Sequence, residues 1–291
     1  GLGDVYKRQS LGSCFGSTGP ASINEITGEP FRLTFPELTI DDMATATKLL
    51  LDKLEINQIH TLIGPSMGGM HALALVVQNH KFVRNLIAIS TAFQSLPYAI
   101  AIRSLQREVI RKDPLWKNGY YTHDNPPLNG VRIARKLGMI SYRSANEWAH
   151  RFGRKKSSKD KITQNTFGFE NTGFEFEIES YLEHLAIKFQ DVFDANCYLY
   201  LSRSIDWFDI IDYGPSSKEV LSKTGLESAL ILGVNSDILF PIDQQKELAE
   251  CLSADSTKVT YKSLDCMQGH DSFLVDTETF SREISCYLKN F

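Results

Sequence analysis

The chain has 291 residues, 42% of them hydrophobic and 23% charged, and a formal net charge of −4. These proportions exclude a disordered or fibrous chain, and the slight acidity argues against a nucleic-acid-binding surface. No stretch approaches the ~20 apolar residues that span a bilayer. Five cysteines without a C-x-x-C spacing indicate neither a disulfide framework nor a structural metal site. We therefore expect a soluble, cytoplasmic protein.

The first nine residues, G-L-G-D-V-Y-K-R-Q, do not fit the pattern of a protein terminus. They lack an initiating Met, and they have no apolar centre that would make them a signal peptide. The run resembles a translated adapter, so we interpret residues 1–9 as a non-native leader. The native sequence would then start near Ser10.

A strand–helix–strand unit follows an N-terminal amphipathic helix. The helix is predicted over 41–54, where acidic residues open the first turn. A short apolar run at 59–64 ends in glycine and predicts a buried strand, and the Ala- and Leu-rich stretch up to residue 80 predicts a buried helix. A second apolar run at 86–90 completes a βαβ unit, which predicts a parallel sheet.

Helical patterns dominate the middle of the chain, and the alternation of strand and helix then returns. The predicted middle helices span 99–111, 130–140, 144–152, 178–189 and 195–209. The later elements are a strand at 228–234, a helix at 242–251, a strand at 258–263 and a helix at 277–288. We therefore divide the chain into a first core part (10–96), a helical insertion (97–221) and a second core part (222–291).

The segment G-P-S-M-G at 64–68 matches the nucleophile-elbow pattern G-x-S-x-G. The mechanism needs a strand before this motif and a helix after it, and both are predicted here. Ser66 would then stand at the positive N-terminus of the helix, where the backbone N–H of Met67 could donate to an oxyanion. A glycine-rich turn with Ser66 as a helix N-cap also accounts for the motif.

A serine nucleophile needs a base, and the base needs an acid that orients it. Of seven histidines, His270 alone follows the last predicted strand in a loop, M-Q-G-H-D-S-F-L. Asp237 follows the strand at 228–234, in N-S-D-I-L-F-P. The order Ser66, Asp237, His270 is that of an α/β-hydrolase fold. Ordinary turn and loop residues are the alternative interpretation of the last two.

These and other segments together resemble homoserine O-acetyltransferase, an acyltransferase family of the α/β-hydrolase superfamily that acts in methionine biosynthesis. The resemblance runs from Leu11 almost to the C-terminus. The segments that carry it are L-G-S-C-F-G-S-T-G-P-A-S-I-N, F-P-E-L-T-I-D-D-M, G-P-S-M-G-G-M-H-A-L, K-F-Q-D-V-F-D-A-N-C-Y-L-Y-L-S-R-S-I-D-W-F-D, S-D-I-L-F-P and Q-G-H-D-S-F-L.

The resemblance implies a ping-pong reaction with acetyl-CoA as co-substrate, no cofactor and no metal. Ser66, deprotonated by His270, would take the acetyl group, and L-homoserine would then accept it. It also implies a helical lid and a homodimer. The residues that match the family's substrate contacts are Arg135, Tyr142 and Asp271.

The acyl group can also be predicted from the resemblance. Relatives that use succinyl-CoA resemble one another in placing an arginine two residues after the triad aspartate, where it can pair with the distal carboxylate. That position is Leu239 here, so we expect acetyl transfer.

The sequence departs from the family at its start. The family's first strands, and the loop that supplies a second oxyanion N–H, have no counterpart before Leu11. We expect an N-terminally truncated α/β-hydrolase fold that, expressed as written, is poorly soluble and slowed by about 10²–10³. The alternatives are a serine O-acetyltransferase, a homoserine O-succinyltransferase, a simple esterase and a non-catalytic α/β binding protein.

Overall fold

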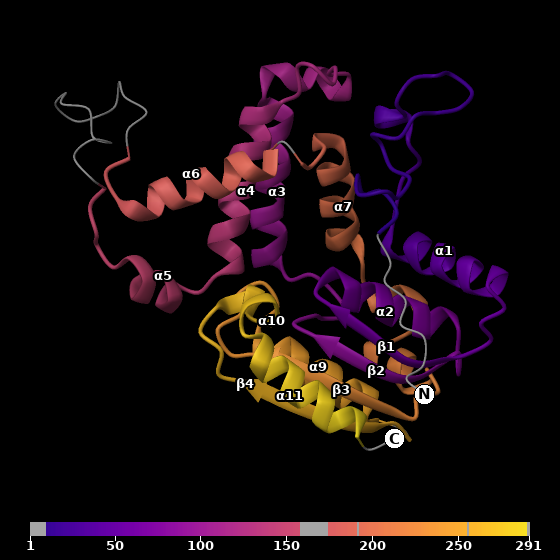
Figure 1. Cartoon of the computed structure of the whole chain (residues 1–291). Helices are drawn as coiled ribbons and strands as arrows, with labels where there is room; N and C mark the ends of the chain where they lie inside the picture. Colours follow the sequence, from indigo (N-terminus) through magenta and orange to yellow (C-terminus); the bar gives the residue numbers. More distant parts are fainter. Residues whose placement is uncertain (1–9, 158–173, 191, 255, 290–291) are drawn as a thin grey trace.

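A four-stranded parallel sheet forms the centre of the computed structural model, which describes residues 10–157, 174–190, 192–254 and 256–289 (Figure 1). The strands lie in the order β1 (Ile59–Pro65), β2 (Val83–Ile89), β3 (Ser228–Val234) and β4 (Lys258–Leu264). Every neighbouring pair is parallel, and the last residues of neighbouring strands are partners or nearly so. The loops after these strands therefore open at one edge of the sheet.

Helices cover the sheet or form the segment between β2 and β3. The α-helices are α1 (Ile40–Lys53), α2 (Met67–Gln78), α3 (Pro97–Lys112), α4 (Leu128–Tyr142), α5 (Ala145–Phe152), α6 (Glu177–Gln190), α7 (Ala195–Trp207), α8 (Ser217–Ser222), α9 (Ile242–Leu252), α10 (Ser272–Val275) and α11 (Thr277–Leu288). The 3₁₀ helices are η1 (Arg32–Thr34), η2 (Pro114–Gly119), η4 (Ile210–Tyr213) and η5 (Gly269–Asp271).

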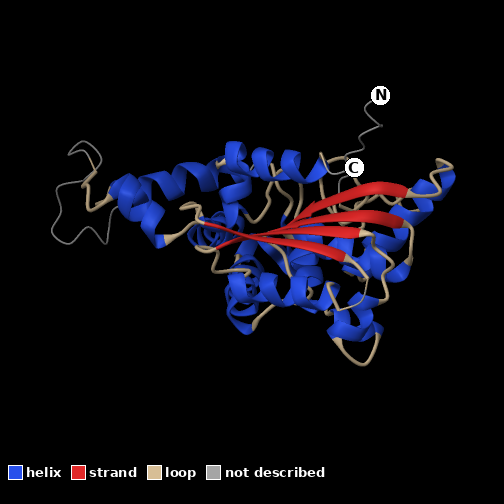
Figure 2. Cartoon of the chain, turned by 90° about the horizontal axis from the view of Figure 1, so that it is seen from below, coloured by secondary structure: helices blue, strands red, loops and turns tan. Residues whose placement is uncertain are grey.

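The sheet has an apolar layer on each face, because side chains alternate between the two faces along each strand. On β2, Leu86 and Ala88 belong to the larger core, which packs under α1, α2 and α9. Their neighbours Ile87 and Ile89 belong to a second core, under α11. Figure 2 shows helices on both sides of the strands. The sheet is therefore buried on both faces, as a parallel sheet requires.

The described elements between β2 and β3 are all helical, from α3 to α8. Helices α3 to α7 stand over the sheet edge where the strands end (Figure 1), whereas α8 packs against α9 in the larger core. Helix α3 packs against α4 and α7, and α4 packs against α6. An ion pair inside this group joins α3 to α7, because Arg103 Nε lies 2.5 Å from Asp206 Oδ1. We call the helices α3 to α7 the lid.

The structure confirms the α/β fold and places a helix or strand at every predicted position. The clearest difference is β2, which begins at Val83 rather than at residue 86. The missed residues include Asn85, a polar residue that is nevertheless fully buried. Its amide donates to the His60 carbonyl, and its side-chain oxygen accepts from Ser228 Oγ. Buried hydrogen bonds of Asn85 thus stabilise the start of this strand, where the sequence has no apolar run that predicts it.

Other sequence predictions remain predictions. Residues 1–9 lie outside the described residues. The division into 10–96, 97–221 and 222–291 stays a prediction. Among the helices that the structure describes, none combines the length and apolar character needed to cross a membrane.

Candidate active site

Ser66 lies at a sharp turn between β1 and α2. Its backbone has φ 52° and ψ −126°, a conformation that L-residues rarely adopt. Gly64 permits the turn, because a Cβ on it would collide with the Gly68 carbonyl. The half-buried serine therefore presents its side chain at the N-terminus of α2, above the ends of the strands.

The structure brings the three predicted catalytic residues into one hydrogen-bonded line. His270 Nε2 lies 2.8 Å from Ser66 Oγ, and His270 Nδ1 lies 2.8 Å from Asp237 Oδ2. His270 and Asp237 are both buried. The carboxylate favours the tautomer with the proton on Nδ1, which leaves Nε2 free to accept the serine proton.

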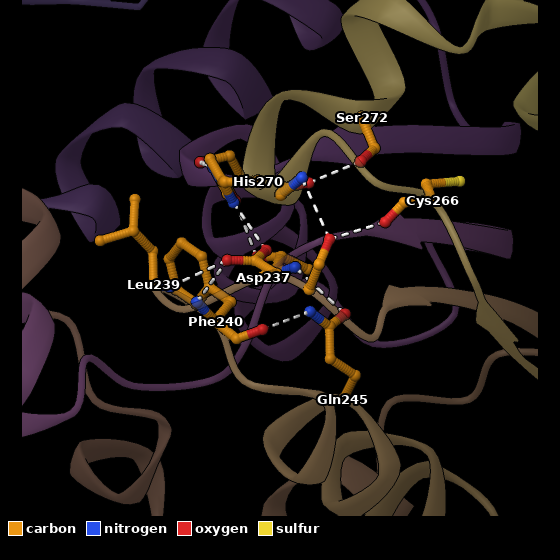
Figure 3. Close-up of polar contacts among 11 residues, drawn as sticks. Asp237, Leu239, Phe240, Gln245, Cys266, His270 and Ser272 are labelled. Atoms are coloured by element: carbon orange, nitrogen blue, oxygen red, sulfur yellow. Dashed lines mark hydrogen bonds and ion pairs between the residues drawn. The ribbon is translucent and has the colours of Figure 1, made fainter. Parts of the chain in front are cut away.

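The loop after β3 fixes the Asp237 carboxylate. Asp237 Oδ1 accepts from the backbone N–H groups of Leu239, at 2.9 Å, and Phe240, at 3.0 Å (Figure 3). The side chain of Leu239 is buried in the larger core. Packing therefore accounts for an apolar residue at this position, and the identity of Leu239 does not by itself decide which acyl group is used.

The loop after β4 places His270. Gly269 has φ +68°, and a Cβ there would lie 2.8 Å from the Ser144 backbone nitrogen. Its N–H donates to Ser236 Oγ at 3.1 Å, and its carbonyl accepts from Ser272 Oγ at 2.7 Å. Ser144 at the start of α5 also donates to the Met267 carbonyl. The lid and the loop after β3 thus hold the histidine loop from both sides.

Two supporting residues were not identified from the sequence. Thr91, two residues after β2, donates from Oγ1 to the Ser66 carbonyl at 2.7 Å. The side chain of Gln245 on α9 accepts from the Thr91 N–H at 3.3 Å and donates to the Phe240 carbonyl at 3.0 Å. Gln245 is fully buried, so it ties the nucleophile turn to the loop of the acid.

The predicted substrate contacts gather beside His270. The rings of Tyr142 and His270 are 6.1 Å apart. The guanidinium of Arg135 lies 5.7 Å from the centre of the Tyr142 ring and 4.5 Å from that of Phe189. Among the described residues, no carboxylate forms an ion pair with Arg135, and its buried Nε has no hydrogen-bond partner. Aromatic packing orients this cation and leaves N–H donors for a ligand.

Asp271, the residue after His270, contacts the lid through Arg143. Its Oδ2 lies 3.2 Å from Nε of Arg143, which also contacts Glu147 on α5. Burial raises the pKa of the Asp271 carboxyl, against the opposing effect of Arg143 and His270. Burial likewise raises the pKa of Tyr142, so this phenol stays protonated at neutral pH. The site therefore holds a cation beside a neutral ring at Arg135 and Tyr142, and a carboxyl group at Asp271 paired with Arg143.

Met67 is the first residue of α2, where helix geometry gives the backbone N–H no partner within the helix. It follows Ser66 directly, as the predicted oxyanion donor must.

In the part of the chain that the structure describes, no group of three or more His, Cys, Asp and Glu side chains could hold a metal ion. The chemistry supported here is acyl transfer through a serine.

Comparison with known proteins agrees with this geometry. The family model of the alpha/beta hydrolase fold matches residues 10–276. Serine O-succinyltransferase from Stenotrophomonas maltophilia is 49% identical over 280 residues, which are 96% of this chain and 74% of the relative. This relative does not support the predicted pairing of homoserine with an acetyl donor, because its name gives serine and succinyl instead.

Solved structures share the same architecture. Homoserine O-acetyltransferase from Bacillus anthracis superposes with a TM-score of 0.82 at 23% identity, over 92% of this chain and 70% of that one. Esterase E22, as its L374D mutant, superposes with a TM-score of 0.81 at 26% identity, over 94% and 72%. The chain belongs to the α/β-hydrolase fold family and, within it, to the O-acyltransferases.

Proposed function

We propose that this protein is a serine O-succinyltransferase, which moves a succinyl group from succinyl-CoA to the hydroxyl of L-serine. The observation that carries acyl transfer is the hydrogen-bonded line from Ser66 through His270 to Asp237. The choice of serine and succinyl rests on the relative from Stenotrophomonas maltophilia, at 49% identity over 96% of the chain.

In the first half-reaction, His270 Nε2 takes the proton of Ser66 as Oγ attacks the thioester carbonyl. The N–H of Met67 stabilises the oxyanion. His270 then protonates the leaving thiol of coenzyme A, and the succinyl group stays on Ser66. Asp237 holds the imidazole in orientation and stabilises its protonated form throughout.

In the second half-reaction, His270 deprotonates the serine hydroxyl, which attacks the acyl-enzyme and releases O-succinylserine. Arg135 binds the carboxylate of the acceptor through paired N–H donors. Asp271 binds its ammonium group, and Tyr142 packs beside both the Arg135 guanidinium and the His270 ring. These roles agree with the absence of an ion-pair partner for Arg135 among the described residues.

Positive charge in the lid supports a dicarboxylic acyl group. Arg103 and Arg107 share the single carboxylate of Asp206, so this buried cluster carries one excess positive charge. The charge of Arg103 acts on Tyr142, beside the catalytic histidine. A succinyl group brings a second carboxylate into this field, whereas an acetyl group brings none.

The test is release of free coenzyme A in four reactions, which combine succinyl-CoA or acetyl-CoA with L-serine or L-homoserine. We expect the highest kcat/KM for succinyl-CoA with serine, by about tenfold or more, since a desolvated charge pair contributes about 1.5–3 kcal/mol. A preference for acetyl-CoA with homoserine would contradict the proposal. It would favour homoserine O-acetyltransferase activity, which the sequence predicts.

A simple esterase is the second candidate, because the fold of esterase E22 matches so closely. An esterase would release p-nitrophenol from p-nitrophenyl acetate at a rate that no amino acid changes. A wild-type rate that serine leaves unchanged would favour the esterase. In Arg135→Gln, we expect the KM for serine to rise by about 10–100-fold while acylation by succinyl-CoA is retained. An unchanged KM for serine would remove Arg135 from the acceptor site.

A further inference from the structure

Arg143 lies where the lid meets the loop that carries His270. It is the first residue after α4, and Ser144 then caps the N-terminus of α5. Ser144 Oγ donates to the Met267 carbonyl, and a Cβ on Gly269 would lie 2.9 Å from the Arg143 carbonyl carbon. The backbone of Arg143 is therefore held against the histidine loop.

The side chain of Arg143 pairs with two carboxylates from different elements. Its Nη1 donates to Oε1 of Glu147, in the first turn of α5, at 2.7 Å. Its Nε lies 3.2 Å from Asp271 Oδ2 in the histidine loop. The side chains of Glu147, Arg143 and Asp271 are 8%, 12% and 17% exposed. Among the described residues, Asp271 has no second ion-pair partner, so the lid supplies the cation that this carboxylate faces.

A carboxylate that is mostly buried needs a nearby cation to stay ionised. Burial raises the pKa of the Asp271 carboxyl, and the charges of Arg143, His270 and Arg135 oppose this effect, that of Arg143 most strongly. In the proposed reaction Arg135 binds the acceptor's carboxylate, and His270 transfers protons. Of these three residues, only Arg143 has no other task in the transfer of the acyl group.

We propose that Arg143 is a positioning residue of the acceptor site, which holds the Asp271 carboxylate in place to bind the acceptor's ammonium group. This inference rests on the proposed function, in which Asp271 binds that group. Arg143 Nε is buried and has no hydrogen-bond partner in the described part of the chain, so attraction between charges holds the pair. Asp271 can therefore accept hydrogen bonds from an ammonium group without losing one from Nε of Arg143.

The first test removes the charge in Arg143→Met and follows acyl transfer against pH. Burial then acts on Asp271 with less opposition, so its carboxyl takes up a proton at higher pH. We expect the pH at which kcat/KM for serine falls to half of its plateau to rise by about 1–3, since a neighbouring arginine changes a carboxyl pKa by this amount. Acylation by succinyl-CoA, measured without an acceptor, should keep its rate and its pH profile.

Two further substitutions of Arg143 separate charge from shape. Arg143→Lys keeps the charge, so its pH profile for serine should stay close to that of the wild type. Arg143→Gln removes the charge but keeps an N–H donor for Glu147, so it replaces Arg143→Met if that variant does not fold in a thermal melt. A folded variant without the charge whose pH profile for serine equals that of the wild type overturns the proposal.

Matched controls test whether Arg143 only fastens the lid. Arg151 is 41% exposed and lies 3.7 Å from the same Glu147 oxygen, and among the described residues it pairs with Glu147 rather than with Asp271. Arg151→Met should therefore leave the pH profile for serine unchanged. Glu147→Gln keeps an acceptor for Arg143 and leaves it paired with Asp271, so the profile should not move to higher pH. Equal changes in Arg143→Met and either control would mean a purely structural role.

The second test does not depend on activity. The full chain is labelled with carbon-13 in its aspartate carboxyl groups, and the Asp271 signal is identified by its absence in Asp271→Asn. We expect this signal to titrate at higher pH in Arg143→Met than in the wild type. Identical titrations overturn the proposal, and a changed titration with an unchanged profile for serine overturns the connection to the acceptor. If the wild type transfers no acyl group to serine, the proposed function fails, and the titration still decides whether Arg143 keeps Asp271 ionised.

Discussion

Ser66 holds a strained backbone conformation because three neighbouring contacts fix it. Its N–H donates to the Ile89 carbonyl at 2.9 Å, and its carbonyl accepts from Thr91. The third contact is the 2.8 Å hydrogen bond of its hydroxyl with His270. Backbone strain of about 1–3 kcal/mol persists only where surrounding contacts fix the conformation. Residues strained in this way cluster at functional sites.

The role of Asp237 gives the first prediction. In Asp237→Asn, the amide can keep one acceptor for the Leu239 and Phe240 N–H groups, so the loop is retained. The amide cannot hold the proton of His270 on Nδ1, so acyl transfer falls by about 10³–10⁴. Steady-state release of coenzyme A measures this loss. A loss of tenfold or less would mean that Asp237 does not orient the histidine.

The raised pKa of Asp271 gives a prediction about pH. The ionised carboxylate binds the acceptor's ammonium, and burial favours the protonated form. As pH falls through this raised pKa, kcat/KM for serine therefore decreases, and above it the value levels off. A pH effect common to both half-reactions also appears in the pH profile of acylation alone, which serves as the control. In Asp271→Asn, the two profiles should coincide; a persisting difference between them would remove Asp271 from the acceptor site.

The meeting of Ser66, Asp237 and His270 was predictable from the sequence, whereas the residues that support this arrangement were not. Ser66, Asp237 and His270 each follow a predicted strand, and the chain order of the three is informative. Thr91 and Gln245 carry no such pattern. Their contribution depends on the distance between α9 and the end of β2, which side-chain packing determines and a single sequence does not reveal.

At the scale of elements, the parallel strands explain why residues 204 positions apart meet, as Ser66 and His270 do. The loops after parallel strands open at the same edge, so each brings one functional group to a common point. The predicted elements were accurate wherever apolar periodicity was strong. They failed at the start of β2, because buried hydrogen bonds of Asn85 replace apolar contacts there.

The loop after β4 gives a prediction about an element. In Gly269→Ala, the new Cβ meets the Ser144 nitrogen at 2.8 Å while φ stays near +68°, so the loop has to move. Because His270 follows directly, we expect kcat to fall by about tenfold or more, with about 1–3 kcal/mol lost in stability. Gly28→Ala is the matched control, since it has φ +73° and open space around it. Equal effects of the two substitutions on kcat would contradict the clash.

On the scale of the whole molecule, ion pairs of a buried aspartate hold two helices of the lid together. Asp206 is 5% exposed and accepts from both Arg103 and Arg107, so it fastens α7 to α3. Nothing in the sequence distinguishes this aspartate from surface aspartates, because its burial depends on how the helices pack. The helical character of the described parts of 97–221 was evident in the sequence, but the way these helices are held together was not.

The lid's ion pairs lead to a prediction about stability. Asp206→Asn leaves two arginines without their carboxylate in a buried setting, which costs about 3–5 kcal/mol. Urea unfolding followed by circular dichroism measures the loss. Glu219→Gln, which breaks the exposed pair with Lys223, should change stability by less than about 1 kcal/mol. A similar midpoint for both variants would mean that the Asp206 pairs contribute no more than surface contacts.

The central claim is that Ser66 carries the acyl group between donor and acceptor, and intact mass after mixing with succinyl-CoA tests it most directly. The measurement needs only a single turnover, so a slow enzyme is no obstacle. We predict an adduct of about 100 Da that maps to Ser66, is absent in Ser66→Ala and is released by L-serine much faster than by water. No adduct, or an adduct that serine and water release equally, would contradict the account.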